Sequence, residues 1–100
     1  MIRLLLVDDQ DIFRQGLATL LSIEEDLEVI AQANNGNSAI ALAEKLQPDV
    51  ILMDIQMPIC NGVTATREIC RRYPWMRILV LTTFDDDEYI GQSLQAGAKG

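Results

Sequence analysis

Three aspartates of this 100-residue chain follow short apolar segments, at positions where their carboxylates could act together. Asp8 and Asp9 come directly after residues 4–7, which are all apolar, and Asp54 comes directly after the apolar residues 50–53. Short runs without a polar residue are typical of strands buried on both faces. If these two strands are parallel neighbours, the three carboxylates meet at the carboxyl edge of the sheet, where open α/β sheets bind ligands.

Such a cluster of carboxylates needs a partner of opposite charge. Like charges held close together repel, so ionising the last carboxyl group becomes costly. A divalent cation removes this repulsion, and Mg²⁺ held by one or two carboxylates usually binds phosphate as well. The sequence therefore predicts a cation site that serves phosphate chemistry. The chain has no histidine, which excludes Ser-His-Asp and Cys-His catalysis and histidine-ligated zinc.

The composition fits one folded domain without a membrane segment. A hydrophobic content of 49% supplies a core for 100 residues, and the net charge of −7 would repel the phosphates of nucleic acids and anionic lipids. No apolar segment reaches the roughly 20 residues that a membrane helix needs. Met1 leads directly into a predicted strand without a signal peptide, so we expect a cytoplasmic protein. Cys60 and Cys70 are then expected to be free thiols.

Hydrophobic patterning predicts four strands, each followed by a helix. The strands are predicted at residues 2–7, 27–33, 49–53 and 78–81. Four such βα units in series indicate an α/β fold with a parallel sheet and right-handed crossovers. In the second strand Glu28 and Gln32 interleave with apolar residues, as in a half-exposed edge strand. Residues 4–7 of the first strand and 50–53 of the third are wholly apolar, so these two strands are predicted to be central. The predicted strand order is 2-1-3-4.

The ends of the helices are marked by polar residues, proline and glycine. Asp11 is placed to cap the first helix. The apolar face of that helix is predicted to consist of Phe13, Leu17, Leu20 and Leu21. Pro48 ends the second helix, the acidic residues 85–88 open the fourth, and Gly97 is well placed to end it.

Several segments resemble the receiver domain of bacterial response regulators, and together they run along the whole chain. They are residues 4–9, 49–58, 80–82 and 96–100. The specific features are Asp8-Asp9 after the first strand, Asp54 in the sequence Met-Asp-Ile-Gln-Met-Pro, and Thr82 ending the fourth strand. Residues 81–89 are similar to the subfamily with a C-terminal LuxR/NarL-type helix-turn-helix domain. The resemblance implies a flavodoxin-like, doubly wound sheet.

The resemblance also implies a phosphorylation switch that depends on Mg²⁺. Asp54 matches the phosphoacceptor, which takes a phosphoryl group from a sensor histidine kinase. Asp9 and Asp54 match the side-chain ligands of Mg²⁺, Asp8 is expected to act directly or through water, and the backbone carbonyl of Gln56 completes the site. Thr82 matches the hydroxyl that contacts the phosphoryl group and moves the helix that follows. We therefore expect a signalling domain, not an enzyme beyond its own phosphotransfer and dephosphorylation.

The hydroxyl at the end of the fourth strand has two candidates. Thr82 and Thr83 are adjacent, and either side chain could donate a hydrogen bond to a phosphoryl oxygen. Successive residues of a strand point to opposite faces, so only one of them lies on the face of the site. Thr82 is the predicted residue.

Compared with the family, residues 1–100 lack several parts. The fifth strand, with its phosphate-binding lysine and aromatic switch residue, and the fifth helix are expected to be missing, as is any DNA-binding domain. Lys99 lies in the turn before the missing strand and is not expected to replace that lysine. The apolar fourth strand would then have an unpaired outer edge. This predicts a homodimer or a strand-exchanged dimer.

Three other functions compete with the receiver interpretation. A phosphohydrolase with an aspartate nucleophile would need a general acid two positions after Asp54, where Gln56 stands. A flavodoxin-like flavin site would need a phosphate loop after the first strand, where the acids of residues 8–11 repel phosphate. A pseudo-receiver that only binds protein partners would not need the complete set of aspartates, although the missing lysine leaves it open.

Overall fold

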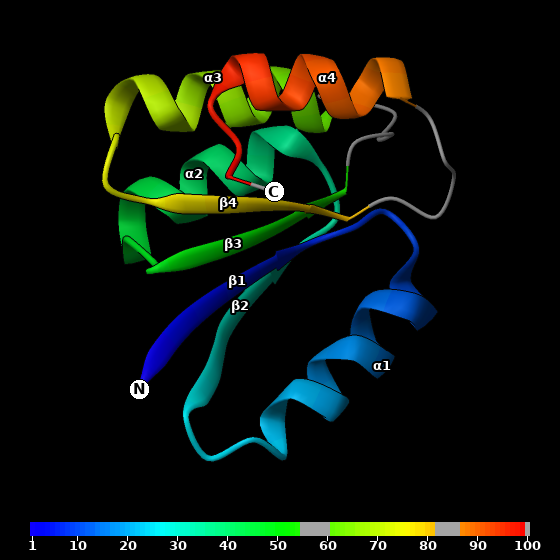
Figure 1. Cartoon of the computed structure of the whole chain (residues 1–100). Coiled ribbons are helices and arrows are strands. Elements are labelled where there is room, and N and C mark those ends of the chain that lie inside the picture. Colours follow the sequence, from blue (N-terminus) through cyan, green and yellow to red (C-terminus); the bar gives the residue numbers. More distant parts are fainter. Residues whose placement is uncertain (55–60, 82–86, 100) are drawn as a thin grey trace.

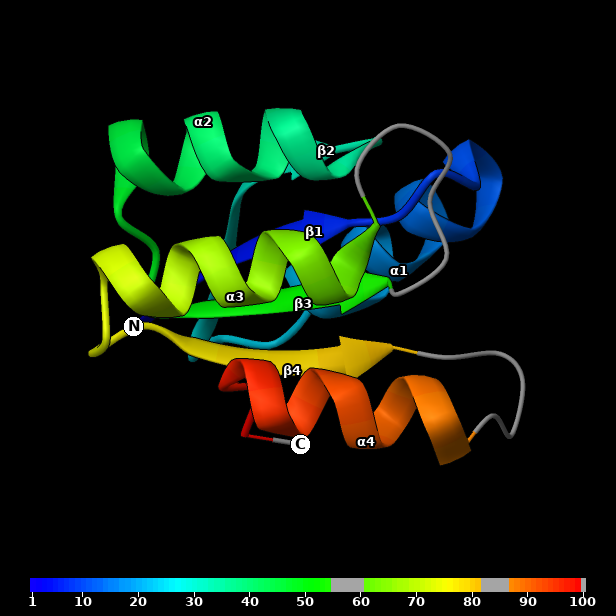
Figure 2. The same ribbon diagram turned by 90° about the horizontal axis from the view of Figure 1, so that it is seen from above.

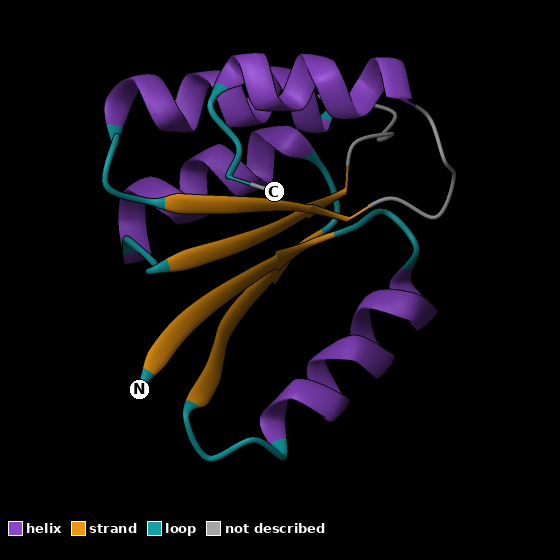
Figure 3. Cartoon of the chain, viewed as in Figure 1, coloured by secondary structure: helices purple, strands orange, loops and turns teal. Residues whose placement is uncertain are grey.

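The computed structural model of this chain describes residues 1–54, 61–81 and 87–99. Strands and helices alternate along the chain, as Figures 1 and 3 show, which confirms the predicted βα pattern. In chain order the elements are β1 (Ile2–Val7), α1 (Asp11–Ser22), β2 (Leu27–Ala33), α2 (Gly36–Leu46), β3 (Val50–Asp54), α3 (Gly62–Arg72), β4 (Arg77–Leu81) and α4 (Asp87–Ala96). None of the helices in these described ranges is long and apolar enough to cross a membrane.

The four strands form one parallel sheet in the order β2-β1-β3-β4, which confirms the predicted order. The register brings the carboxyl ends of the strands level with one another. Val7, the last residue of β1, pairs with Ala33 on one side and Met53 on the other, and Asp54 of β3 pairs with Leu81. The residues that follow β1 and end β3 therefore lie next to each other at one edge of the sheet.

The helices cover the two faces of the sheet unequally. Helices α2, α3 and α4 lie on one face, whereas α1 lies on the other (Figures 1 and 2). The core lies mainly under α2 and α3, where Val7, Ile51, Met53, Ile69 and Ile78 are fully buried. This packing of β-branched and long apolar side chains holds the central strands rigidly in place beneath the carboxyl edge.

Helix α1 is less buried than its sequence pattern suggests. Leu17 and Leu21 of the predicted apolar face are half-buried, but Phe13 and Leu20 are 42% and 65% exposed. The physical reason is the place of the helix: α1 contacts β2 and β1, which form one side of the face of the sheet that α1 covers. Leu79 of β4, at the opposite edge of the sheet from β2, is 40% exposed. Exposed apolar side chains are therefore not confined to α1.

The ends of the helices confirm one prediction and correct another. Gly97 follows α4 with a φ of 119°, a value that only glycine adopts readily, so it ends the helix as predicted. The prediction that Asp11 caps α1 is wrong. The capping position is Gln10, which makes no side-chain capping bond, and Asp11 is the first helical residue. Its carboxylate forms an ion pair with Arg14, three residues further along the same helix, at 2.8 Å.

Candidate metal and phosphoacceptor site

The structure brings together the three aspartates at the carboxyl edge of the sheet. Asp8 and Asp9 lie in the loop between β1 and α1, and Asp54 ends β3. One carboxylate oxygen from each residue lies within 4.8 Å of the others. Asp8 is buried, Asp54 is half-buried and Asp9 is exposed. Three oxygen ligands of this kind, open to solvent on one side, suit a hard divalent cation such as Mg²⁺.

Asp8 is held by hydrogen bonds at its backbone N–H, its carboxylate and its carbonyl. Its backbone N–H donates to the carbonyl of Ala33 in β2 at 3.0 Å. Its carboxylate oxygen Oδ1 accepts from the backbone N–H of Gln10 at 2.8 Å, and its carbonyl accepts from Nη1 of Arg14 at 2.7 Å. The carboxylate therefore has a defined orientation before any ligand binds, as a preorganised site requires.

Burial is the main cause that raises the pKa of Asp8 above its ordinary value. The N–H of Gln10 opposes this shift, the neighbouring Asp9 carboxylate adds to it, and the positive charge of Arg14 opposes it. The raised pKa means that an ionised Asp8 costs folding free energy in the absence of a cation. A bound cation would remove that cost, which agrees with the predicted chemistry of the site.

Asp8→Asn is expected to raise the free energy of unfolding at pH 7 without metal, because it removes a charge that is unfavourable mainly through its burial. The expected gain is about 1 kcal/mol. Asparagine keeps the oxygen that accepts from Gln10 but carries no charge. Since the pKa is raised in the folded state, the protonated carboxyl favours folding below its unfolded pKa. This contribution is lost as the pH rises through the folded pKa.

Urea denaturation at several pH values measures the effect of Asp8→Asn. The difference in the free energy of unfolding between the variant and the parent should shrink as the pH falls towards about 4, the ordinary pKa of aspartate. Asp26→Asn, which removes an exposed carboxylate before β2, is the matched control and should change stability little. A variant at Asp8 that is less stable than the parent at pH 7 would contradict the prediction.

The structure places Lys99 away from the aspartates and leaves other predicted residues undescribed. The backbone N–H of Lys99 donates to the carbonyl of Ile78, near the amino end of β4, at 2.8 Å. The aspartates lie at the opposite, carboxyl edge, so Lys99 does not replace a phosphate-binding lysine there. Gln56 and Thr82, together with the alternative Thr83, lie outside the described residues. So does Cys60, whereas Cys70 is a free thiol.

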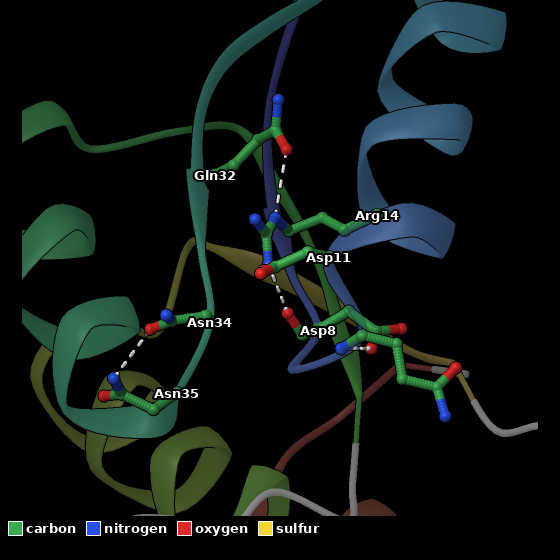
Figure 4. A network of polar contacts seen from close by, with 7 residues as sticks. Asp8, Asp11, Arg14, Gln32, Asn34 and Asn35 are labelled. Carbon is green, nitrogen blue, oxygen red and sulfur yellow. Dashed lines mark hydrogen bonds and ion pairs between the residues drawn. The ribbon is translucent and has the colours of Figure 1, made fainter.

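Sequence reasoning missed two residues beside the cluster, Arg14 and Gln32. Nε of Arg14 donates to Oε1 of Gln32 at 3.0 Å, in addition to the bond from Arg14 to Asp8 (Figure 4). One signal was present: Arg14 stands one helical turn after Gln10, so its side chain can reach back to the acidic loop. No signal in the sequence pointed to Gln32, because a polar residue at this position is expected of an edge strand.

Known proteins resemble this chain in sequence and in structure. The transcriptional regulatory protein LnrK of Bacillus subtilis is 49% identical over 100 residues, and the match covers all of this chain and 46% of that protein. The transcriptional regulatory protein DegU of Brevibacillus brevis is 46% identical over 99 residues, covering 99% of this chain and 42% of that protein. The chain thus spans about half the length of these relatives.

A solved structure shows the same fold. The crystal structure of a LuxR-family two-component response regulator from Aurantimonas sp. SI85-9A1 superposes with a TM-score of 0.94 at 32% identity. The match covers 100% of this chain and 71% of that one. Residues 4–100 match the response regulator receiver domain family. The chain therefore belongs to the response regulator receiver domain family.

Proposed function

We propose that this chain is the phosphoacceptor domain of a two-component response regulator, and that Asp54 accepts the phosphoryl group from a sensor histidine kinase. One observation carries the proposal: Asp54 ends a buried strand with its carboxylate beside those of Asp8 and Asp9, within 4.8 Å. Three carboxylates this close repel one another, so their grouping favours a site that binds a cation over a surface aspartate without a function. The half-buried position of Asp54 leaves it accessible to a donor.

In the proposed reaction, a carboxylate oxygen of Asp54 attacks the phosphorus of a phosphohistidine. An O–P bond forms, the N–P bond breaks, and the imidazole nitrogen takes up a proton. The attack needs the carboxylate in its ionised form and in line with the leaving nitrogen. Because Asp54 is the last residue of a strand paired on both sides, its backbone has a fixed place at the edge of the sheet.

The acidic cluster fits the binding of Mg²⁺. Asp8, Asp9 and Asp54, with the backbone carbonyl of Gln56, would hold the ion by oxygen atoms alone, as this hard cation prefers. When bound, Mg²⁺ neutralises negative charge on the transferred phosphoryl group and on the carboxylates. The burial of Asp8, which raises its pKa, supports a cation here, because an unneutralised carboxylate in that place costs free energy.

The proposed output follows from the segment after β4. Thr82 would donate a hydrogen bond to the phosphoryl oxygen and so shift the chain that leads into α4. In relatives about twice as long, the remaining length has room for a further domain. We propose that this chain controls a helix-turn-helix domain outside residues 1–100, and that the protein acts in the cytoplasm as a transcription regulator.

The test of this function is the intact mass of the chain after incubation with Mg²⁺ and acetyl phosphate. The gain of one phosphoryl group, absent from the Asp54→Asn variant, is the expected result. A pseudo-receiver, which binds partners without accepting phosphate, is the other function considered. The grouped carboxylates of Asp8, Asp9 and Asp54 disfavour it, because repelling charges without a ligand bring only a cost.

We also propose that two copies of this chain associate at the outer edge of β4. In the described part of the chain, β4 is an edge strand whose Leu79 is 40% exposed, and its outer edge accepts one backbone hydrogen bond, from Lys99 at Ile78. Exposed apolar edge strands pair readily with other chains. Size-exclusion chromatography with light scattering should give the mass of a dimer at high concentration, and Leu79→Lys should shift it towards the monomer.

The control for this association is Ile12→Lys, which puts the same charge on α1 at a residue that is 90% exposed. It lies on a different element from β4, so the dimer should persist in this variant. A monomeric parent at high concentration, or a dimer that Leu79→Lys leaves unchanged, would refute association through β4.

A further inference from the structure

Arg14 is a largely buried arginine that contacts both the acidic loop and the neighbouring strand. Its side chain is only 11% exposed. The guanidinium donates to the backbone carbonyl of Asp8 at 2.7 Å and to Oε1 of Gln32 at 3.0 Å, and it pairs with Asp11 at 2.8 Å (Figure 4). An arginine offers several donors in a rigid plane, so it can hold three partners at fixed angles to one another.

These contacts close a ring of hydrogen bonds around the loop that carries Asp9. The backbone N–H of Gln10 donates to the carboxylate of Asp8 at 2.8 Å. The carbonyl of Gln10 accepts from the backbone N–H of Arg14 at 2.9 Å, and the Arg14 side chain returns to the carbonyl of Asp8. Asp9 lies between Asp8 and Gln10, and it is the exposed member of the cluster. The ring therefore fixes the backbone on both sides of a carboxylate that packing does not hold.

The same side chain fixes this loop to the sheet. Gln32, which accepts from Nε of Arg14, precedes Ala33 in β2, and the carbonyl of Ala33 accepts from the backbone N–H of Asp8. Adjacent residues of β2 thus hold the loop from two directions. Asp54 is placed separately, by the pairing of β3 with β1 and β4. The distance between the loop acids and Asp54 accordingly depends on how firmly the loop is held against β2.

We propose that Arg14 is a positioning residue, which holds Asp8 and Asp9 at the spacing from Asp54 that Mg²⁺ binding needs. This inference rests on the proposed metal-dependent function of the site. Groups that orient metal ligands without touching the metal commonly affect affinity by about 10–100-fold. Arg14 has this relation to the cluster, because it contacts the backbone of Asp8 and not its carboxylate.

The charge of Arg14 and its hydrogen bonds predict opposite effects on Mg²⁺ binding when the residue is removed. Removing a positive charge beside three carboxylates would, by Coulomb attraction alone, strengthen the binding of a divalent cation. Removing the hydrogen bonds that hold the loop would weaken it. We expect Arg14→Ala to bind Mg²⁺ about tenfold more weakly than the parent, against the sign of the charge effect.

The experiment is a Mg²⁺ titration followed by the amide chemical shifts of the folded protein, which gives the dissociation constant independently of stability. Arg3→Ala is the matched control. The Arg3 guanidinium also donates to backbone carbonyls, those of Gln47 at 3.0 Å and Leu46 at 2.8 Å. It does so at the amino end of β1, at the opposite edge of the sheet. Arg3→Ala should reduce stability in urea but leave the dissociation constant unchanged.

Two more conservative variants keep the inference testable if Arg14→Ala does not fold. Arg14→Lys keeps the charge but loses the planar set of donors, and Gln32→Leu removes only the contact with β2. Both should weaken Mg²⁺ binding, by smaller factors than Arg14→Ala. Unchanged or tighter binding in all three variants would overturn the role of Arg14 while leaving the proposed function standing. A parent protein and an Arg3→Ala variant that both fail to bind Mg²⁺ would refute the metal site itself and this inference with it.

Discussion

Asp54→Asn is expected to abolish phosphorylation of this chain while leaving its fold intact. Asparagine has nearly the same shape as aspartate, but its amide nitrogen and carbonyl cannot form an acyl phosphate as a carboxylate does. Asp54 is half-buried at the end of β3, where the paired neighbours β1 and β4 fix the backbone. The substitution also removes one charge from the cluster, so any change in stability should be a small gain.

The measurement is the intact mass after incubation with Mg²⁺ and acetyl phosphate. The parent should gain one phosphoryl group, and omission of Mg²⁺ should suppress the gain. Asp26→Asn, which removes an exposed carboxylate before β2, is the matched control and should react like the parent. A gain that persists in Asp54→Asn would mean that another residue accepts the group.

An unreactive parent would have a different meaning from a reactive Asp54→Asn variant. A chain extended through a fifth strand would then be compared with residues 1–100. Reaction of the extended chain alone would show that residues of the extension are required for acceptance. No reaction of either chain would favour the pseudo-receiver, in spite of the grouped carboxylates.

Much of the fold could be predicted from the sequence because burial in a parallel sheet leaves a local pattern. The uninterrupted apolar residues 4–7 of β1 and 50–53 of β3 indicate strands covered on both faces, and Glu28 and Gln32 mark β2 as an edge. The juxtaposition of Asp8 and Asp54 followed from this order alone, because the carboxyl ends of parallel neighbours share one edge. No long-range contact had to be known beforehand.

The details that sequence reasoning missed depend on contacts between distant elements. The bond from Arg14 to Gln32 depends on how α1 lies against β2, which no local pattern encodes. The exposure of Leu20, at 65%, likewise depends on what covers α1 and not on the period of its apolar residues. Local chemistry thus predicted which residues gather, but not what holds them in place.

Gly97→Ala is expected to destabilise the chain by about 2–4 kcal/mol, for two independent reasons. Gly97 has a φ of 119°, which costs an L-residue conformational energy. An added Cβ would also lie 2.8 Å from Sγ and 2.9 Å from Cβ of Cys70 in α3, closer than carbon atoms pack. The clash cannot be relieved by moving only the tip of a flexible side chain, because Cβ of Cys70 is fixed to the helix.

Two other glycines provide matched controls with the opposite expected sign. Gly16 lies within α1 and Gly91 within α4, and a Cβ at either would meet nothing within 4 Å. Alanine favours helix over glycine by about 0.5–1 kcal/mol, so Gly16→Ala and Gly91→Ala should stabilise the chain. Urea denaturation of the three variants under one condition measures all of these effects, and equal changes at Gly97 and Gly91 would contradict the prediction.

Part of the steric cause at Gly97 can be isolated by removing the sulfur atom that it faces. In a Cys70→Ala background the contact at 2.8 Å is gone, whereas the positive φ and the contact with Cβ at 2.9 Å remain. Gly97→Ala should therefore cost less stability in that background, and the difference is the coupling energy of the pair.

The effect of Gly97→Ala should extend to β4, because Ala98 is buried in the core and Lys99 bonds to Ile78 directly after the turn. A displaced turn would pull both from β4, so the amide of Lys99 should exchange with solvent faster in Gly97→Ala than in Gly91→Ala.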